Sequence, residues 1–542
     1  MMGEMRNEQA PKRSRSEFSY QIAQPLIIRT RRARPLVLVL ITQSQAARIL
    51  AVFPVPSISH QVVFRPLTQE LAKRGHQVVV VTPDPAFPKG KTPANLTEID
   101  THDISYAQWE NLHKLTSAGD DDMASHLIPI FTIFNEVFEA QLKTAEVQKL
   151  LHEKFDLLLI EACVRSALSL SHVIKAPVIQ VSSLGFMEFN AETVGAPMHP
   201  LLYPSLFRQR VFNLTYWEKI TEVWNIYKLN QRIDSVEQLE NEMAKRNFGP
   251  DIPSMSELKK NVDMVFLNAH PIWDSNRPVP PSVVYMGGIH QKPAKELPQD
   301  LKNYLDSSKH GIIYMSFGTN VKPSLLPQEK IKLILRVLSQ LPYDVLFKWD
   351  KDVLPGQAAN IKITKWVPQS DMLKHPNIKL FITQGGLQST DEAITAGVPL
   401  IAIPIRADQW YNSEQYEYHR IGKKLDIGTL TEEKIRTAIN TIINDESYRR
   451  NIVRLRGLMR DEPQGPLDRV VWWTEHVLRH GGAAHLRGPA ANMSWTDYLE
   501  LELVLILIVS VLIVTVLLYI VLLSIWRTIS QNLTVSMKVK ST

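Results

Sequence analysis

Cysteine is almost absent from this 542-residue chain, which contains only Cys163. A single cysteine excludes an intrachain disulfide, a cysteine-based zinc site and Cys-x-x-Cys redox chemistry. Three catalytic signatures are also missing: Gly-x-Ser-x-Gly, Gly-x4-Gly-Lys-Ser/Thr and His-Glu-x-x-His. Serine hydrolases, P-loop nucleotide hydrolases and zinc proteases therefore lose their main support. We expect no metal site and no cofactor.

The chain also lacks a strong excess of charge. Its formal net charge is +6, and part of this comes from a basic segment near the N-terminus. That segment has no interleaved aromatic residues and no known nucleic-acid reader motif, so we expect no nucleic-acid partner. The length is too great for one hydrophobic core, which predicts at least two domains.

Buried-strand patterns recur through the first half of the chain. A βαβ opening is predicted by an apolar run at 48–53, a helical pattern at 59–74 and four valines at 78–81. Further strands are expected at 156–160, 177–181 and 264–268. These alternate with helical patterns, which is typical of a doubly wound domain. The first domain is predicted to span residues 48–275.

A second α/β series follows a proline-rich stretch. Five prolines lie between residues 278 and 298, a composition that favours a linker over 276–300. Strands are then expected at 311–318, 345–348, 361–364, 379–383 and 400–404. The second domain is predicted to span 301–480, and its last segment, from 461, is expected to cross back onto the first domain. The predicted fold class is α/β, with two facing Rossmann-like domains and a C-terminal transmembrane helix.

Residues 503–526 contain no charge and would form a helix of about 36 Å, enough to cross a bilayer. Glutamates precede this run and Arg527, Lys538 and Lys540 follow it. The positive-inside rule therefore puts the tail, 527–542, in the cytosol and the body of the protein in the lumen. The two lysines resemble a retrieval signal of the endoplasmic reticulum, although a plain stop-transfer anchor fits equally well. We expect a single-pass protein of the endoplasmic-reticulum membrane.

A lumenal body requires a targeting sequence. Basic residues at 29–34, an apolar stretch at 36–41 and small residues at 44–47 predict a signal peptide within an N-terminal segment that spans 1–47. Residues 1–34 then form an unusual extension, or the true start lies further along the chain. Four Asn-x-Ser/Thr sequences occur. Glycosylation is expected at Asn95, Asn213 and Asn492 in the lumen, and none is expected at the cytosolic Asn532.

The strongest functional pattern lies between residues 366 and 409. The strand-like run 378–383 leads through Gly385 and Gly386 into a segment with the helix-start pattern Gln-Ser-Thr-Asp-Glu at 388–392. The free N–H groups and the dipole of a helix that begins at a strand end favour a phosphate. The two glycines would let the phosphate approach closely. This pattern predicts a diphosphate site that needs no metal.

The whole motif resembles the donor-binding signature of the UDP-glycosyltransferase family, in its membrane-anchored, UDP-glucuronosyltransferase-like branch. The resemblance runs from about residue 48 to 526 and is closest to the insect-type members. It implies the following contacts: Trp366 with uracil, Gln369 with uridine, Gly386, Gln388 and Ser389 with the phosphates, Glu392 with the ribose, and Asp408 and Gln409 with the sugar. Each role suits its residue type, because aromatic faces stack on bases and carboxylates accept hydrogen bonds from hydroxyls.

Two further features of the donor site come from the resemblance. The strand end at Ser316 and Thr319 is expected to lie near the donor, since ligands of open α/β sheets collect at carboxyl ends of strands. Gln384 departs from the pattern, because many members have His there. A Gln amide still donates to a phosphate oxygen but adds no charge.

The resemblance also supplies a catalytic pair. His60, after the first strand and at a helix start, matches the family's catalytic histidine, and histidine is the natural base for removing a hydroxyl proton. Its acidic partner is expected at Glu161, where the family usually has Asp. Asp156 is the other candidate for this acidic partner, but it lies near the opposite end of the strand and is the weaker of the two.

These features predict an inverting, metal-independent transfer of a hexosyl group from UDP-glucose or UDP-glucuronate to a hydroxyl of a small lipophilic acceptor. The alternative is an inactive, membrane-anchored, lipophile-binding relative, which the departures at Gln384 and Glu161 motivate. A homo-oligomer is compatible with either. One region stays open: the aromatic and basic residues between 207 and 227 form either an interfacial surface or acceptor portal, or amphipathic helices that pack on their own domain.

Overall fold

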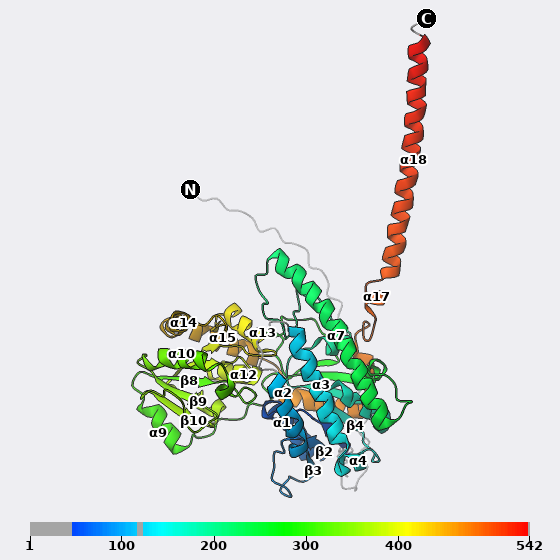
Figure 1. The fold of residues 1–542 in the computed structure, drawn as a ribbon. Helices are drawn as coiled ribbons and strands as arrows, with labels where there is room; N and C mark the ends of the chain where they lie inside the picture. Colours follow the sequence, from blue (N-terminus) through cyan, green and yellow to red (C-terminus); the bar gives the residue numbers. More distant parts are fainter. Residues whose placement is uncertain (1–45, 116–122, 540–542) are drawn as a thin grey trace, which may run out of the picture. The chain divides into compact units, whose positions relative to one another are not determined.

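The computed structural model describes residues 46–115 and 123–539 of the chain (Figure 1). These residues contain two sheets, each made only of parallel strands. The N-terminal signal sequence predicted within residues 1–47 lies almost entirely outside the described residues.

The first sheet has seven strands in the order β3-β2-β1-β4-β5-β6-β7. Except for the partly polar edge strand β3, its strands are rich in apolar residues and are buried on both faces, as expected where helices cover a parallel sheet. They are β1 (Arg48–Val52), β2 (Gln77–Thr82), β3 (Leu96–Asp100), β4 (Leu157–Glu161), β5 (Val178–Ser182), β6 (Val262–Leu267) and β7 (Val283–Tyr285).

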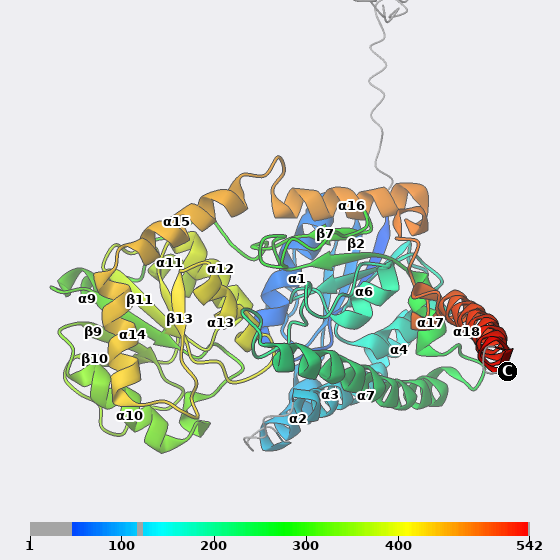
Figure 2. The same ribbon diagram turned by 90° about the horizontal axis from the view of Figure 1, so that it is seen from above.

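Helices connect these strands and cover the sheet (Figures 1 and 2). They are α1 (Ile58–Lys73), α2 (His102–Leu115), α3 (Met123–Leu142), α4 (Ala145–Leu150), α5 (Leu170–Ile174), α6 (Glu188–Val194), α7 (Tyr216–Phe248) and α8 (Met255–Leu258), with short 3₁₀ turns at Arg165–Ser169 and Lys259–Asn261. The longest, α7, begins at a capping box in which Thr215 and Glu218 bond each other's backbone N–H, and it ends at Gly249.

The second sheet has six strands in the order β10-β9-β8-β11-β12-β13. They are β8 (Ile312–Ser316), β9 (Asp344–Lys348), β10 (Ile361–Thr364), β11 (Ile378–Thr383), β12 (Leu400–Ala402) and β13 (Gly422–Lys424). The helices of this domain are α9 (Gln299–Ser307), α10 (Gln328–Ser339), α11 (Gln369–Met372), α12 (Leu387–Ala396), α13 (Gln409–Tyr418), α14 (Glu432–Asn444) and α15 (Ser447–Arg460), with a 3₁₀ turn at Pro323–Leu325.

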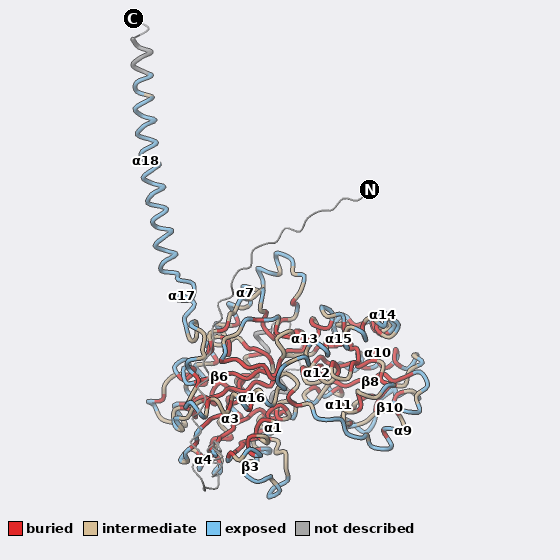
Figure 3. Tube along the Cα trace, turned by 180° about the vertical axis from the view of Figure 1, so that it is seen from behind, coloured by how far each residue is buried: buried red, intermediate tan, exposed pale blue. Residues whose placement is uncertain are grey.

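The end of the chain returns to the first domain before it reaches the apolar helix. Figure 2 shows α15 over the second domain and α16 (Pro466–His480) over the first, where α16 packs against α1 and β7. A 3₁₀ turn (Ala484–Leu486) and α17 (Trp495–Tyr498) lead into α18 (Leu501–Val539). Residues 501–533 of α18 are long and apolar enough to span a membrane and are exposed along their length (Figure 3).

The predicted fold class is therefore confirmed, whereas the proposed linker is partly wrong. Residues 283–285 lie inside the expected linker 276–300 but form β7, which pairs with β6 and closes the edge of the first sheet. The prolines on either side of this strand favoured the prediction of a linker, because proline is unfavourable within a strand. The short or partly polar strands β3 and β13 were also missed.

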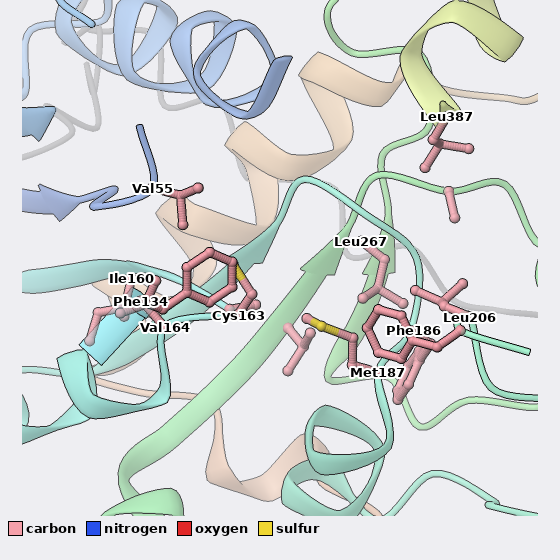
Figure 4. Close-up of a cluster of buried hydrophobic side chains, with 14 of the residues drawn as sticks. Val55, Phe134, Ile160, Cys163, Val164, Phe186, Met187, Leu206, Leu267 and Leu387 are labelled. Atoms are coloured by element: carbon pink, nitrogen blue, oxygen red, sulfur yellow. The ribbon is translucent and has the colours of Figure 1, made fainter. Parts of the chain in front are cut away.

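The two domains pack on each other through apolar and polar contacts. One core cluster includes residues of both sheets, and Figure 4 draws four of its members: Leu387 of α12, and Leu206, Phe186 and Leu267 of the first domain. Trp273 Nε1 donates to Asn412 Oδ1 at 2.9 Å. The described domains therefore share a buried interface.

Candidate active site

A cavity of about 540 Å³ lies between the two domains, where the carboxyl ends of both sheets meet. Loops that follow β1, β4, β8, β11 and β12 contribute to its walls. The volume suits a small-molecule site. Its two halves differ in chemistry, because the first domain supplies mainly apolar groups and the second mainly polar ones.

The apolar half is formed by the start of α1, by α2 and α3, and by the segment after β5. Its walls are Ile58, Trp109, Leu127, Ile130, Phe131, Phe134, Leu184, Met187 and Phe207. Aromatic rings pack against one another here, with Phe131 edge-on to Phe134 at 6.0 Å between ring centroids. Such a surface binds a flat or hydrocarbon-rich molecule by removing its apolar area from water.

His60 lies at the boundary between the two halves. It belongs to the first turn of α1, and Gln61 fixes the preceding loop by donating to the carbonyls of Phe53 and Val55, both at 3.1 Å. His60 Nδ1 lies 2.7 Å from Oε1 of Glu161, the last residue of β4. The other oxygen, Oε2, accepts the Val55 N–H at 3.0 Å.

This geometry selects one histidine tautomer. An ionised carboxylate only accepts hydrogen bonds, so the bond to Glu161 keeps the hydrogen on Nδ1 and leaves the Nε2 lone pair free. The Glu161 side chain is fully buried, which prevents water from competing for this bond. Asp156 cannot substitute for it, since its Oδ2 accepts the Arg48 N–H at the opposite end of the strands.

The turn after β11 brings glycines of two loops around one amide. Thr383 Oγ1 donates to Gln384 Oε1 at 3.0 Å, so the Nε2 group of Gln384 is directed away from the strand. A Cβ at Gly386 would lie 2.9 Å from this Nε2, and one at Gly318, where φ is +74°, would overlap it. Position 318 therefore favours glycine because its backbone is left-handed, whereas a Cβ at Gly386 would require only the end of the Gln384 side chain to move. The amide lines the cavity beside the N-terminus of α12, where a phosphate would be stabilised.

A hydrogen-bond network joins three of the expected donor-binding residues. Tyr314 Oη donates to Gln369 Oε1 at 2.9 Å, which fixes the orientation of this amide. Gln369 Nε2 then donates to Ser389 Oγ at 3.0 Å and to Glu392 Oε2 at 2.7 Å. Burial raises the pKa of Glu392 to about 7, and the Gln369 bond opposes this shift. A vicinal diol that donates to the carboxylate would favour its ionised form.

Asp408 and Gln409 occupy the start of α13 with different freedom to bind. Asp408 Oδ2 accepts from Asn412 Nδ2 at 2.8 Å, and burial raises the Asp408 pKa to about 6. Gln409 Oε1 accepts the backbone N–H groups of Ile405 and Arg406 at 2.8 and 2.9 Å. Its oxygen therefore holds the β12–α13 loop, and only its Nε2 remains for a ligand.

Comparison with known proteins identifies the family to which a chain with this site belongs. A family model described as UDP-glucoronosyl and UDP-glucosyl transferase matches residues 48–534. The chain belongs to this family. The resemblance inferred from the 366–409 motif is therefore confirmed, and the protein is a UDP-glycosyltransferase.

Relatives and solved structures agree with the assignment. An ecdysteroid UDP-glucosyltransferase of Spodoptera littoralis nuclear polyhedrosis virus is 36% identical over 490 residues, which cover 86% of this chain and 95% of the relative. The UDP-glycosyltransferase UGT5 of Dactylopius coccus is 33% identical over 474 residues, 85% of this chain and 88% of the relative. The glycosyltransferase of kitacinnamycin (TM-score 0.57, 18% identity) and the calicheamicin glycosyltransferase CalG4 (0.56, 17%) each cover 80% of this chain, with 100% and 99% of their own lengths matched. At these identities the structures show the two-domain glycosyltransferase fold alone.

Most of the expected site residues of this glycosyltransferase line the cavity. They are His60, Thr319, Trp366, Gln369, Gln384, Gly386, Gln388, Ser389, Glu392, Asp408 and Gln409. Trp366 leaves 61% of its area exposed, and Lys348 Nζ lies 4.5 Å from its ring centroid. Ser316 does not line the cavity. It is buried, and its Oγ accepts the Gly318 N–H at 3.3 Å, so it shapes the turn behind the site.

The Gln388 side chain has a different partner from the expected phosphate. Its Nε2 donates to the Ser183 carbonyl of the first domain at 3.0 Å. The side chain therefore connects the α12 N-terminus to the opposite domain. Sequence reasoning could not anticipate this bond, because the two residues are 205 positions apart.

Two cavity residues were missed altogether. His290 is buried, and its ring nitrogens make no hydrogen bond of good geometry among the described residues; burial lowers its pKa to about 4, and a contact with the Gln388 backbone opposes this shift. Asn320 Nδ2 donates to Ser57 Oγ at 2.9 Å and so joins the β8 loop to the start of α1. A His after Gly-Gly-Ile in the predicted linker was the only signal for the first, and nothing in the sequence indicated the second.

One group of side chains among the described residues has a spacing that a metal ion could use. The ligand atoms of His60, Glu161 and Cys163 all lie within 4.8 Å of one another. Cys163 Sγ donates to Glu161 Oε1 at 3.6 Å, and burial raises the pKa of this thiol. The 2.7 Å contact between His60 and Glu161 accounts for their closeness without an ion.

The expected glycosylation sites differ in accessibility. Asn95 and Asn213 are exposed and adopt left-handed backbone conformations in loops. Asn492 is half-buried, its Nδ2 donates to the Thr193 carbonyl at 3.4 Å, and its Oδ1 is buried with no hydrogen-bond partner among the residues that the structure describes. Asn95 Nδ2 makes a similar bond, to the Ala72 carbonyl at 3.4 Å, so it is the greater burial of Asn492 that makes it the least accessible of the three.

Proposed function

We propose that this UDP-glycosyltransferase moves glucose from UDP-glucose to a hydroxyl group of a small lipophilic acceptor, with His60 as the general base. The observation that carries the proposal is the 2.7 Å contact between His60 Nδ1 and Glu161 Oε1 at the junction of an apolar and a polar half-site. The apolar half holds the acceptor. The polar half holds the UDP-sugar.

In this mechanism His60 Nε2 removes the proton of the acceptor hydroxyl as the oxygen attacks the anomeric carbon of the sugar. The bond from that carbon to the diphosphate breaks on the opposite face, so the configuration inverts. Glu161 stabilises the imidazolium that forms and keeps it oriented. The leaving diphosphate gains its stabilisation from the N–H groups of α12 and from the Gln384 amide, without a metal or other cofactor.

Glucose is preferred as the donated sugar for two reasons. Relatives at 36% and 33% identity carry the name UDP-glucosyltransferase, and Asp408 suits a neutral sugar that offers only hydroxyl donors. Arg406 supports the competing donor, UDP-glucuronate. It lines the cavity, and a guanidinium there could pair with the sugar carboxylate.

We propose further that α18 anchors the enzyme in the endoplasmic-reticulum membrane with both domains in the lumen. Its apolar span, 501–533, exceeds the thickness of a bilayer core, and Arg527 lies near the expected cytosolic end. The lipophilic acceptors would then be drawn from a pool that partitions into the same membrane.

The experiment that tests these proposals offers UDP-glucose, UDP-glucuronate, UDP-galactose and UDP-N-acetylglucosamine, each with a generic phenol, to membranes that contain the enzyme. We expect consumption of UDP-glucose at a rate unchanged by a chelator. Arg406→Ala distinguishes the two donors, because it should leave glucose transfer intact and abolish only glucuronate transfer. No consumption of any donor, combined with retained binding of the phenol, would favour the inactive lipophile-binding relative.

A further inference from the structure

The two halves of helix α7 have different environments. In its C-terminal half, Val236, Met243 and Ala244 are buried against the first domain. In its N-terminal half, six large apolar side chains are between 51% and 85% exposed. They are Tyr216, Trp217, Ile220, Val223, Trp224 and Tyr227, here termed the α7 stripe.

The α7 stripe is a continuous surface. The spacing of Tyr216, Ile220, Val223 and Tyr227 is four, three and four residues, which puts them on one face of a helix. Trp224 stacks on Tyr227 with 5.4 Å between ring centroids. Elsewhere on the described surface of the two domains, exposed apolar residues are mostly scattered singly, which is normal for a soluble surface. A continuous stripe of six large apolar side chains is unusual on such a surface.

The charges around the stripe match a lipid headgroup region. Lys219 and Lys228 place their ammonium groups 5.5 and 5.7 Å from the Tyr216 and Trp224 rings. The nearby carboxylates already have basic partners: Glu222 pairs with Arg208 at 3.3 Å, and Glu218 pairs with Arg210. Unopposed lysines beside Trp and Tyr are typical of segments that lie at a membrane interface.

The stripe also lies close to the start of the apolar anchor. Ile226 and Asn230 of α7 line a small cavity together with Trp495 of α17, six residues before α18 begins. In Figures 1 and 3 the N-terminal end of α7 lies on the side of the first domain from which α18 leaves. Trp495, Tyr498 and Leu499 are themselves 44–49% exposed. Two groups of aromatic residues therefore face the region where the chain enters the bilayer.

We propose that the α7 stripe binds the surface of the bilayer that α18 anchors, as a second contact between the first domain and the membrane. The inference rests on the proposed anchoring. Asn213 limits the depth of insertion, because it lies three residues before Tyr216 and a glycan on it must stay hydrated. The stripe therefore lies at the level of the headgroups, with its rings at the boundary to the acyl chains.

The single cysteine makes a direct test practicable. In a Cys163→Ser background, the full-length enzyme is placed in phospholipid nanodiscs, and a nitroxide is attached to Trp217→Cys or Trp224→Cys. The matched control is Leu239→Cys, on the same helix, 43% exposed and about 33 Å from position 217. Collision of each label with oxygen, which concentrates in lipid, is compared with collision with a water-soluble nickel chelate.

We expect oxygen to dominate at positions 217 and 224 and the nickel chelate to dominate at 239. Nickel access at 217 and 224 equal to that at 239 would overturn the proposal. Shielding that appears only in discs with two copies of the enzyme would also overturn it, by making the stripe a dimer interface. Turnover of UDP-glucose in the same discs separates the proposals: an active enzyme with hydrated labels refutes only the membrane contact, and an inactive enzyme with lipid-exposed labels refutes only the enzymatic function.

Discussion

Replacement of Glu161 by Gln tests whether this carboxylate sets the tautomer of His60, which removal of the histidine cannot do. The carboxylate accepts two hydrogen bonds at once, one from His60 Nδ1 at 2.7 Å and one from the Val55 N–H at 3.0 Å. A Gln side chain has only one oxygen. One of its two ends must therefore present an N–H group to a partner that carried a hydrogen before.

The orientation that Gln adopts follows from the cost of each choice. If its oxygen faces His60, its amide N–H faces the Val55 N–H, and a buried donor without a partner costs about 1–3 kcal/mol. If its oxygen faces Val55, its amide donates to His60 Nδ1, and the imidazole hydrogen moves to Nε2. The imidazole can change its tautomer, whereas the backbone cannot, so we expect the second orientation. It removes the lone pair that the base needs.

The expected result for Glu161→Gln is a loss of kcat of about 10²- to 10⁴-fold, close to that of His60→Ala, with unchanged affinity for UDP. Release of UDP from UDP-glucose and a phenol measures kcat, and calorimetry measures UDP binding. Cys163→Ser is the matched control, because it changes a group 3.6 Å from the same carboxylate but leaves both acceptor contacts intact. Wild-type kcat in Glu161→Gln would show that Glu161 does not set the tautomer of His60.

The donor site and the membrane topology lead to three further predictions. Glu392→Ala should weaken UDP binding by roughly ten- to a hundredfold, since it removes a buried acceptor. Asp408→Ala should leave UDP affinity intact and raise the KM for UDP-glucose. Equal losses of UDP binding in the two variants would assign Asp408 a structural role. Because burial raises the Glu392 pKa to about 7 and a bound ribose favours the ionised form, UDP affinity should fall as the pH falls through 7, and Glu392→Gln should lose this part of the dependence in calorimetry. Glycosidase-sensitive mass should be lost in Asn95→Gln and Asn213→Gln but not in Asn532→Gln; a glycan on Asn532 would invert the proposed orientation.

Local sequence predicted most of the donor half of the site. The residues from Trp366 to Gln409 lie at three helix starts and on the two strands between them, all consecutive in the chain, so their spacing alone places them together. The fold class was predictable for a related reason, because parallel strands that are buried on both faces give continuous apolar runs.

Contacts between the domains could not be predicted in this way. Gln388 bonds to Ser183, and Asn320 bonds to Ser57, across separations of 205 and 263 residues. No local pattern encodes such a pair. The aromatic region after residue 207 shows the same limit, since Phe207 is buried in the acceptor half of the cavity while Trp217 is 78% exposed, and a stripe of apolar residues does not reveal which of the two applies.

If α18 anchors the enzyme, the return of the chain to the first domain determines which domain the membrane holds. Although α18 follows the second domain in sequence, α16 packs on α1 and β7, Ala483 donates its N–H to Asp263, and Gly488 donates its N–H to Val194. An anchor at α18 would therefore hold the first domain directly, and the second domain would be attached to the membrane only through the first. If the cleft opens to release UDP, the acceptor pocket keeps a constant height above the lipid while the other domain swings. A lipophilic molecule leaving the bilayer would meet the same entrance throughout the catalytic cycle.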